Sequence, residues 1–244
     1  MENETFTLHY HLTAGECDAT GHIPVTGLTE RLIEVATEHA NLLGIGYSTL
    51  IKSGISWVLT RLSIEMTRYP GINDEYSITT WIEAINRRFS ERNMLIRDGS
   101  GEIIGYARTV WVAIDVESRG MGDLSCLQDI EIPVSDTPCP MAKHPKLVAP
   151  GPDALEFQYT FRYLDLDFNR HVNTVRYIDL ILNRWPLEHY DTHSIARIDI
   201  SFSHECYFGE TVLVRADQGG DVNHCELLHE GRKMVASRII WRDK

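Results

Sequence analysis

Two stretches of the sequence repeat each other: residues 10–30 read YHLTAGECDATGHIPVTGLTE, and residues 159–179 read YTFRYLDLDFNRHVNTVRYID. Shifting the first stretch by 149 positions lays it on the second without a gap. The matched pairs share their chemistry: Tyr10 with Tyr159, Glu16 with Asp165, Asp18 with Asp167, and His22 with His171. Several matches in one register indicate that the chain contains two related halves.

Each repeat is followed by the same series of expected elements. Apolar residues recur at helical spacing over 28–43 and over 175–185. We expect Asn173 to cap the second helix and Pro186 to end it. Runs rich in β-branched and aromatic residues predict strands at 55–66, 76–84, 93–97, 103–114, 195–203, 211–216, 225–229 and 234–241. A strand, a helix and four strands per half indicate an α+β fold, with each helix lying on an antiparallel sheet.

The prolines mark the segment between the halves. Residues 133–152 carry six of the nine prolines, which is typical of an extended linker and not of a third domain. We therefore expect an N-terminal domain over 1–130, a Pro-rich linker over 131–153 and a C-terminal domain over 154–244.

The composition argues against several classes of protein. The chain has 244 residues, 43% of them hydrophobic, and a formal net charge of −12. Nucleic acids and anionic membranes are bound through dense Lys and Arg, so we expect neither as a partner. No apolar stretch approaches the roughly 20 residues of a membrane span. The acidic, polar start and five scattered cysteines, which we interpret as free thiols, favour a cytoplasmic protein.

Motifs of common cofactor and metal sites are missing from the sequence. It has no Gly-rich phosphate loop, no Gly-x-Ser-x-Gly elbow and no His-Glu-x-x-His. These absences count against an NTPase, a dinucleotide enzyme, an α/β-hydrolase and a metalloprotease. We expect no cofactor and no metal.

Polar side chains gather just before the second expected helix, where residues 165–173 read DLDFNRHVN. Asp167, Asn169 and His171 alternate by two, so in an extended segment they would point to one side. A carboxylate, an amide and an imidazole facing one space can bind a carbonyl oxygen, orient a water and move a proton. An ordinary turn with helix capping uses the same residue types, and composition alone favours that simpler interpretation.

A second polar cluster, His204-Glu205-Cys206, stands at the end of an expected strand. Glu205 offers a general base, and Cys206 offers a nucleophile if the imidazole of His171 lies near it. A strand end with a buried cysteine and a solvated glutamate would explain the same residues. Their spacing does not fit a zinc site.

From about Thr5 to Trp241 the chain resembles the acyl-ACP thioesterases of plants and bacteria. Residues 165–178, DLDFNRHVNTVRYI, look like that family's signature, and its first half is matched in order by WVLTR at 57–61, RYP at 68–70 and VWV at 110–112. The resemblance implies a tandem double hotdog fold, in which each half wraps an antiparallel sheet around a long helix. It also implies hydrolysis of fatty acyl thioesters on acyl carrier protein (ACP), which releases free fatty acid and ends chain elongation.

Carried over residue by residue, the resemblance assigns catalytic roles to Asp167, Asn169, His171, Glu205 and Cys206. In one mechanism, Cys206 attacks the thioester with help from His171. In the other, Glu205 activates a water, Asn169 and His171 hold the thioester carbonyl, and Asp167 orients its neighbours. We favour the water route, because hotdog hydrolases that resemble this chain generally use a carboxylate.

The first half departs from this pattern. Thr20 stands where the second half has Asn169, and Tyr69 or a close neighbour stands where it has Glu205. We therefore expect a single active site, in the second half, with the first half supplying walls of the acyl pocket. The candidates for these walls are strand residues: Trp57, Leu59, Leu62, Ile64 and Trp81. For any single one of them, the pattern favours an ordinary core position over a place in the pocket wall.

The implied partner, ACP, is acidic, so a protein of this charge needs a local positive dock. Arg170 and Arg176 flank the catalytic segment and are our candidates for this dock.

A chain with two such halves would act as a monomeric pseudo-dimer or as a homodimer. Competing functions are an acyl-CoA thioesterase, a 3-hydroxyacyl-thioester hydratase and a non-catalytic acyl-thioester sensor. Asn169 together with Glu205 favours hydrolysis.

Overall fold

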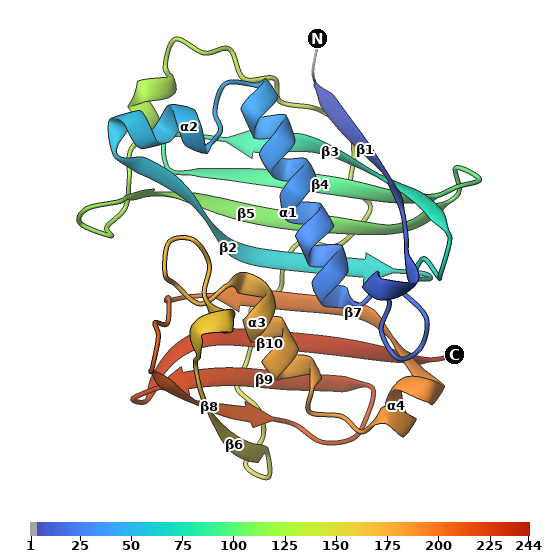
Figure 1. Ribbon diagram of the computed structural model, residues 1–244. Coiled ribbons are helices and arrows are strands. Elements are labelled where there is room, and N and C mark those ends of the chain that lie inside the picture. Colours follow the sequence, from blue (N-terminus) through green and yellow to red (C-terminus); the bar gives the residue numbers. More distant parts are fainter. Residues whose placement is uncertain (1–3) are drawn as a thin grey trace. The chain divides into compact units, whose positions relative to one another are not determined.

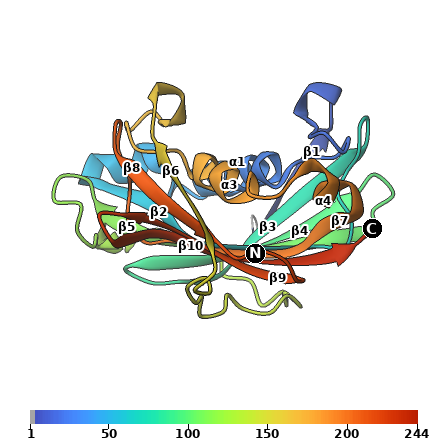
Figure 2. The ribbon, with the colours of Figure 1, turned by 90° about the horizontal axis from the view of Figure 1, so that it is seen from below.

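The computed structural model describes residues 4–244 and divides into two compact units, one up to Lys143 and one from His144 (Figure 1). The division falls inside the Pro-rich segment. Within each unit, a helix lies against one face of an antiparallel sheet (Figure 2). No helix among residues 4–244 is long and apolar enough to cross a membrane.

In the N-terminal unit, the helix α1 (Val25–Leu42) buries an apolar stripe that includes Leu28, Leu32 and Val35. Burying one such side chain contributes about 1.5–3 kcal/mol, so the stripe fixes the helix to the sheet. The strands follow the order β1-β3-β4-β5-β2, and each neighbouring pair is antiparallel. Their bounds are β1 (Thr5–His11), β2 (Ile55–Met66), β3 (Glu75–Ile85), β4 (Phe89–Asp98) and β5 (Ile103–Asp115). The short helices are η1 (Ala14–Glu16), α2 (Tyr47–Leu50), η2 (Ile51–Ser53) and η3 (Leu124–Leu127).

The C-terminal unit repeats this plan with shorter elements. Its helix α3 (Thr174–Leu182) buries Val175, Ile178 and Ile181, and it lies on strands in the order β7-β10-β9-β8-β6. Neighbouring strands are again antiparallel. The bounds are β6 (Leu155–Thr160), β7 (His193–Phe202), β8 (Thr211–Ala216), β9 (Val222–His229) and β10 (Arg232–Asp243). Two short helices complete the unit: η4 (Tyr163–Asp165) and α4 (Leu187–Thr192).

The start of α3 agrees with the prediction, and its end does not. The side-chain oxygen of Asn173 accepts a hydrogen bond from the amide of Val175 at 3.2 Å, which is the predicted N-cap. The helix ends at Leu182, however, and Pro186 is the residue before α4. A proline is tolerated just before a helix because the first amides of a helix lack intrahelical partners.

Strand β4 begins at Phe89 instead of the predicted Asn93. Its first residues look polar in the sequence, yet Arg92 is buried against α1. The Arg92 guanidinium donates a hydrogen bond to His39 Nδ1 of that helix at 2.7 Å. Burial lowers the pKa of Arg92 to about 10. A buried arginine with a specific partner therefore occupies a core position that hydrophobicity alone does not reveal.

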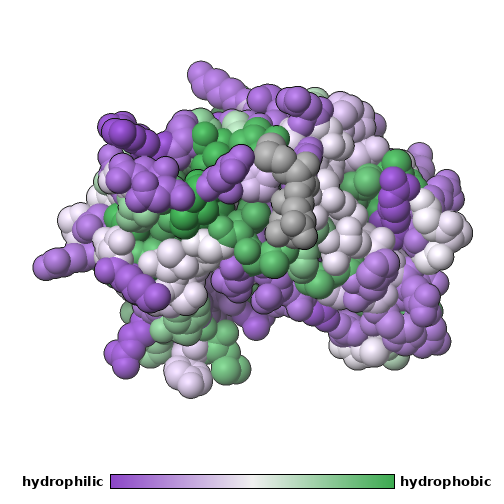
Figure 3. All heavy atoms as spheres, turned by 90° about the horizontal axis from the view of Figure 1, so that it is seen from above, coloured by the Kyte–Doolittle hydropathy of each residue, from purple (hydrophilic) through white to green (hydrophobic). Residues whose placement is uncertain are grey.

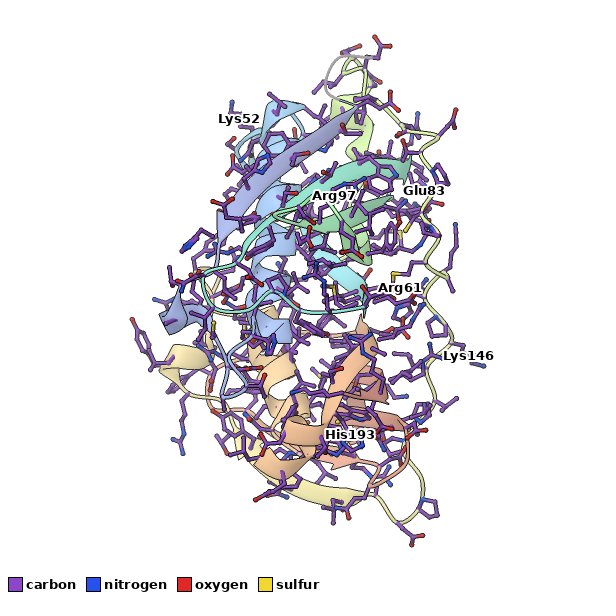
Figure 4. All side chains as sticks on the ribbon, turned by 90° about the vertical axis from the view of Figure 1, so that its right-hand side faces the viewer. Lys52, Arg61, Glu83, Arg97, Lys146 and His193 are labelled. Carbon is purple, nitrogen blue, oxygen red and sulfur yellow. The ribbon has the colours of Figure 1, made fainter. Side chains whose placement is uncertain are left out.

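The first part of the Pro-rich linker packs on the sheet of the N-terminal unit. The amide of Ser135 donates to Ile82 O at 2.9 Å, and the Trp81 indole donates to Thr137 O at 3.1 Å. Arg108 binds two linker carbonyls and also pairs with Glu83, which is labelled in Figure 4. Trp81 is thus covered by the linker, contrary to the expectation that it lines an acyl pocket.

A separate apolar cluster closes one end of the N-terminal unit. Side chains from α2, η3 and the neighbouring strands bury one another there, among them Ile45, Leu50 and Leu124. Figure 3 looks onto this end, where apolar atoms gather among polar ones. Trp57 packs against this cluster, and its indole donates to Ile45 O at 3.0 Å.

Candidate functional site

The loop that precedes α3 is closed by the carboxylate of Asp167. One oxygen of Asp167 accepts hydrogen bonds from the amides of Asn169, at 2.8 Å, and His171, at 3.0 Å. The Asp167 amide donates in turn to His171 O at 2.8 Å. The segment is therefore a tight turn, which was the simpler of the two interpretations of its sequence, and not an extended segment. Asp and Asn hold such turns because their short side chains reach nearby backbone amides.

A second segment, residues 205–207, is bound to this loop. The amide of Val172 donates to Cys206 O at 2.9 Å, and His171 pairs with Tyr207 in an isolated antiparallel bridge. These contacts bring His171 Nδ1 to 3.5 Å from Glu205 Oε1. The His171 side chain is 16% exposed and that of Glu205 is 29% exposed, so the pair is reachable from solvent. The Tyr207 ring meets the imidazole edge-on, at 5.1 Å between centroids.

Cys206 lies in different surroundings from its neighbour Glu205. Its side chain is fully buried, and burial raises the pKa of its thiol to about 11. Its amide donates to the Tyr177 hydroxyl of α3 at 2.9 Å. Burial also raises the pKa of that hydroxyl, which keeps Tyr177 neutral. Tyr177 was not singled out in the sequence, where it occupies an apolar position of the helical pattern.

Asn169 stands apart from the other four predicted site residues. It is exposed at the tip of the turn, and its side-chain amide makes no hydrogen bond within residues 4–244. The loop therefore holds the His171 imidazole beside the Glu205 carboxylate, while the Asp167 carboxylate binds backbone amides of the turn. The side-chain amide of Asn169 is left available to an incoming molecule.

The N-terminal unit builds the same loop with different side chains. Asp18 accepts from the amide of Thr20 at 2.8 Å, and its own amide donates to His22 O at 2.8 Å. The amide of Ile23 donates to Pro70 O at 3.0 Å, which matches the bond from Val172 to Cys206. Pro70 therefore occupies the position of Cys206, and Tyr69 occupies that of Glu205. This copy of the loop lacks the carboxylate that faces the histidine.

The predicted docking arginines differ in their surroundings. Arg176 is exposed and pairs with Asp179 of its own helix at 2.8 Å. Arg170 is exposed, forms no ion pair within the described part of the chain, and has a left-handed backbone with φ of 65°. Among the predicted pocket residues of the N-terminal unit, Leu59, Leu62 and Ile64 are almost completely buried. Residues 4–244 contain no cluster of His, Cys, Asp and Glu able to hold a metal ion.

The two units, each a sheet curved around a helix, define a tandem double hotdog fold. Residues 3–125 match the acyl-ACP thioesterase N-terminal domain, and residues 150–243 match the acyl-ACP thioesterase C-terminal domain. A crystal structure of an acyl-ACP thioesterase from Bacteroides thetaiotaomicron is 31% identical, covers 99% of both chains and superposes with a TM-score of 0.91. The chain belongs to the acyl-ACP thioesterase family.

The chain is also similar to several plant enzymes. A chloroplastic palmitoyl-acyl carrier protein thioesterase from Cuphea hookeriana is 27% identical over 260 residues, which are 98% of this chain and 62% of that protein. A chloroplastic oleoyl-acyl carrier protein thioesterase from Arabidopsis thaliana is 29% identical, over 90% of this chain and 71% of that protein. This chain therefore spans less than two thirds of the Cuphea relative. The 12:0-ACP thioesterase structure from Umbellularia californica, at 22% identity and a TM-score of 0.82, shares the fold.

Proposed function

We propose that this protein hydrolyses the thioester of fatty acyl-ACP and releases free fatty acid, which ends chain elongation. The observation that carries the proposal is the pair of His171 and Glu205, with 3.5 Å between Nδ1 and Oε1, beside a loop that the N-terminal unit repeats without the carboxylate. Membership of the family supports the same reaction.

In the proposed mechanism, Glu205 is the general base. Its carboxylate takes a proton from a water molecule, and the water oxygen forms a bond to the thioester carbonyl carbon. The carbonyl oxygen becomes an oxyanion, which His171 and the exposed amide of Asn169 stabilise by hydrogen bonding. The C–S bond then breaks, and the departing sulfur takes the proton back from Glu205. Asp167 positions the other groups, because its carboxylate holds the amides of Asn169 and His171.

The environment of Cys206 supports this route over a thiol nucleophile. A thiolate is the reactive form of cysteine, and a pKa of about 11 leaves about one molecule in ten thousand ionised at pH 7. Catalytic cysteines usually have lowered pKa values and some exposure, whereas this side chain is fully buried. In our proposal, the role of Cys206 is structural: its carbonyl oxygen accepts a hydrogen bond from the amide of Val172, which holds the loop against the segment that carries Glu205.

We further propose that ACP docks beside the loop at Arg170 and Arg176, and that Trp57 and Leu59 contribute to binding the acyl chain.

We also propose a cytoplasmic location, which is supported by the five cysteines, all of them free thiols. We retain a division into domains at 1–130 and 154–244 with the linker between them, acting as a monomer or as a homodimer.

The proposed function is tested by following the release of free thiol from a series of substrates. Purified wild-type protein is compared on acyl-ACP, acyl-CoA and 3-hydroxyacyl thioesters across chain lengths, with Glu205→Gln as the matched control. Fastest release from acyl-ACP, lost in Glu205→Gln, is the expected result. A preference for acyl-CoA, or hydration without thiol release, would assign the protein to another hotdog enzyme class. Binding without turnover of any thioester would make it a sensor.

A further inference from the structure

Large apolar side chains stand exposed around the loop of the C-terminal unit. Tyr163 is 79% exposed, Leu164 78%, Phe168 79% and Phe208 64%. We call these four residues the apolar rim. Exposed apolar residues that occur singly are ordinary, but a group of them at one site marks a contact surface.

The rim residues come from backbone segments that are bonded to one another. Tyr163 and Leu164 belong to η4, the turn that projects at the upper left of Figure 2, and Phe168 follows in the loop itself. The amide of Asn173 donates to Asp165 O at 2.8 Å, which ties η4 to the start of α3. Phe208 follows the segment that contacts His171, and the next amide, that of Gly209, donates to Phe161 O at 3.0 Å. The rim is thus built onto the same frame as the His171–Glu205 pair.

The N-terminal unit provides an internal comparison. In its copy of these turns, the first three rim positions carry the small residues Ala14, Gly15 and Ala19, and Ile72 stands at the fourth. The backbone hydrogen bonds are nevertheless the same. The amide of Leu12 donates to Asp74 O at 2.9 Å in the N-terminal unit, and the amide of Phe161 donates to Glu210 O at 3.0 Å in the C-terminal unit. The loop therefore folds without large apolar side chains at the first three positions, and their presence in the C-terminal unit needs another reason.

Two arginines add positive charge to this rim. Arg162 and Arg170 are both exposed, and neither forms an ion pair with any residue of the described chain. At their positions the N-terminal unit has the uncharged Thr13 and Gly21. The nearby carboxylates are bound to backbone amides of the same turns, at Asp165, Asp167 and Glu210. Within this chain of net charge −12, the rim therefore combines two exposed arginines, unpaired among the described residues, with exposed apolar side chains.

We propose that the apolar rim, with Arg162 and Arg170, is the surface on which the acidic carrier protein of the substrate docks. This inference rests on the proposed function and deepens it, because it assigns the contact surface of the carrier. An acidic partner that presents carboxylates around apolar side chains would match both features of the rim. The carrier then holds its thioester beside the loop that bears Asn169 and His171.

The test replaces three of the rim residues with the residues that stand at the matching positions of the N-terminal unit. The variant Tyr163→Ala/Leu164→Gly/Phe168→Ala carries the side chains of Ala14, Gly15 and Ala19 on the same backbone turns. A second variant, Arg162→Thr/Arg170→Gly, removes the charges in the same way. The matched control is Leu155→Ala/Leu187→Ala, which removes two apolar side chains that are 52% and 55% exposed elsewhere in this unit.

KM and kcat are measured for acyl-ACP and for the same acyl group on N-acetylcysteamine, which lacks the carrier. We expect KM for acyl-ACP to rise about tenfold or more in each rim variant, with kcat retained. Hydrolysis of the carrier-free thioester should stay close to wild type, and the control should change the hydrolysis of neither substrate. Thermal unfolding should show that both rim variants remain folded. The KM of the charge variant should also lose most of its dependence on salt.

Three results would overturn the proposal. Equal losses on both substrates would give the rim a role in folding or in catalysis, and no change in KM for acyl-ACP would remove it from docking. Co-sedimentation of wild type, but not of the rim variant, with phosphatidylglycerol vesicles, together with an unchanged KM, would assign the rim to a bilayer. Failure of the wild type to hydrolyse acyl-ACP would instead contradict the proposed function, so the two inferences fail separately.

Discussion

Glu205 and Cys206 are neighbours in the chain, yet only one of them has an environment suited to catalysis. The Glu205 carboxylate is partly exposed and faces His171, whereas the Cys206 thiol is fully buried with a raised pKa. A general base contributes about 10²–10⁴-fold to a rate. We therefore expect Glu205→Ala to lower kcat for acyl-ACP by about 10³-fold and Cys206→Ala to keep most of it. Steady-state thiol release measures both, and the opposite ranking would make Cys206 the nucleophile.

At Arg170 the backbone, and not the side chain, sets the expected effect on stability. Its φ of 65° lies in the left-handed region, where a side chain costs about 1–2 kcal/mol, and Gly21 holds the matching position with φ of 77°. Replacing Arg170 with glycine would remove this cost, but the greater flexibility of glycine in the unfolded chain offsets part of the stability gained. We expect Arg170→Gly to raise the free energy of unfolding by about 0.5–1 kcal/mol, measured by urea denaturation.

The converse change, Gly21→Arg, serves as its matched test. A Cβ at Gly21 would meet its nearest neighbour, Ile72 Cδ1, at an ordinary 3.8 Å, so the strain comes from the backbone alone. This variant should lose stability by an amount similar to the gain in Arg170→Gly. A stabilising Gly21→Arg would show that the left-handed conformation is not the cause.

At the scale of elements, the chain offers two copies of one loop, and only one copy faces a carboxylate. Asp167 and Asp18 accept equivalent amide hydrogen bonds, at 2.8–3.0 Å in the C-terminal loop and 2.8–3.4 Å in the N-terminal one. Either aspartate contributes about 1 kcal/mol or more to stability through these bonds. We expect Asp167→Ala to lose that stability and also at least 10²-fold in kcat, because His171 is no longer held beside Glu205.

The control for this prediction is Asp18→Ala. It should lose comparable stability in thermal unfolding while kcat for acyl-ACP stays within a few-fold of wild type. Equal kinetic losses in the two variants would mean that both loops serve the reaction, and the assignment of one site to the C-terminal unit would then be wrong.

At the scale of the whole molecule, the sequence predicts the architecture well. The two halves repeat each other in one register, and the signals for helices and strands depend on residues close in the chain. The register from Asp18 to Asp167 and from His22 to His171 identifies turns that prove to have matching hydrogen bonds. Helical spacing and β-branched runs give the elements for the same reason, since each depends on residues close in the chain.

Features that depend on distant residues were not predictable in this way. The alternation of Asp167, Asn169 and His171 fits an extended strand and a tight turn equally, and only the bonds to Asp167 distinguish them. Trp81 looks like a pocket residue until the linker, more than fifty positions later, is found to cover it. The apolar rim was missed because exposure cannot be read from a hydrophobic residue type.

The buried thiols predict how the whole protein responds to alkaline pH. Burial raises the pKa of Cys206 to about 11 and that of Cys225 to about 12, against roughly 8.5 in an unfolded chain. Above pH 8.5 the folded state therefore holds more protons than the unfolded state, so stability is complete below this pH and is lost as pH rises toward 11–12. We expect the free energy of unfolding to fall between pH 8 and pH 10.5, by roughly 2–2.5 kcal/mol for each thiol. Urea denaturation under reducing conditions at the two pH values measures this fall.

The variant Cys225→Ala should show a smaller fall in the free energy of unfolding between the two pH values, even though it is less stable than wild type at pH 8. Cys126 is exposed, so the control Cys126→Ala should show the same fall as wild type. An equal fall in both variants would place the alkaline sensitivity elsewhere in the molecule.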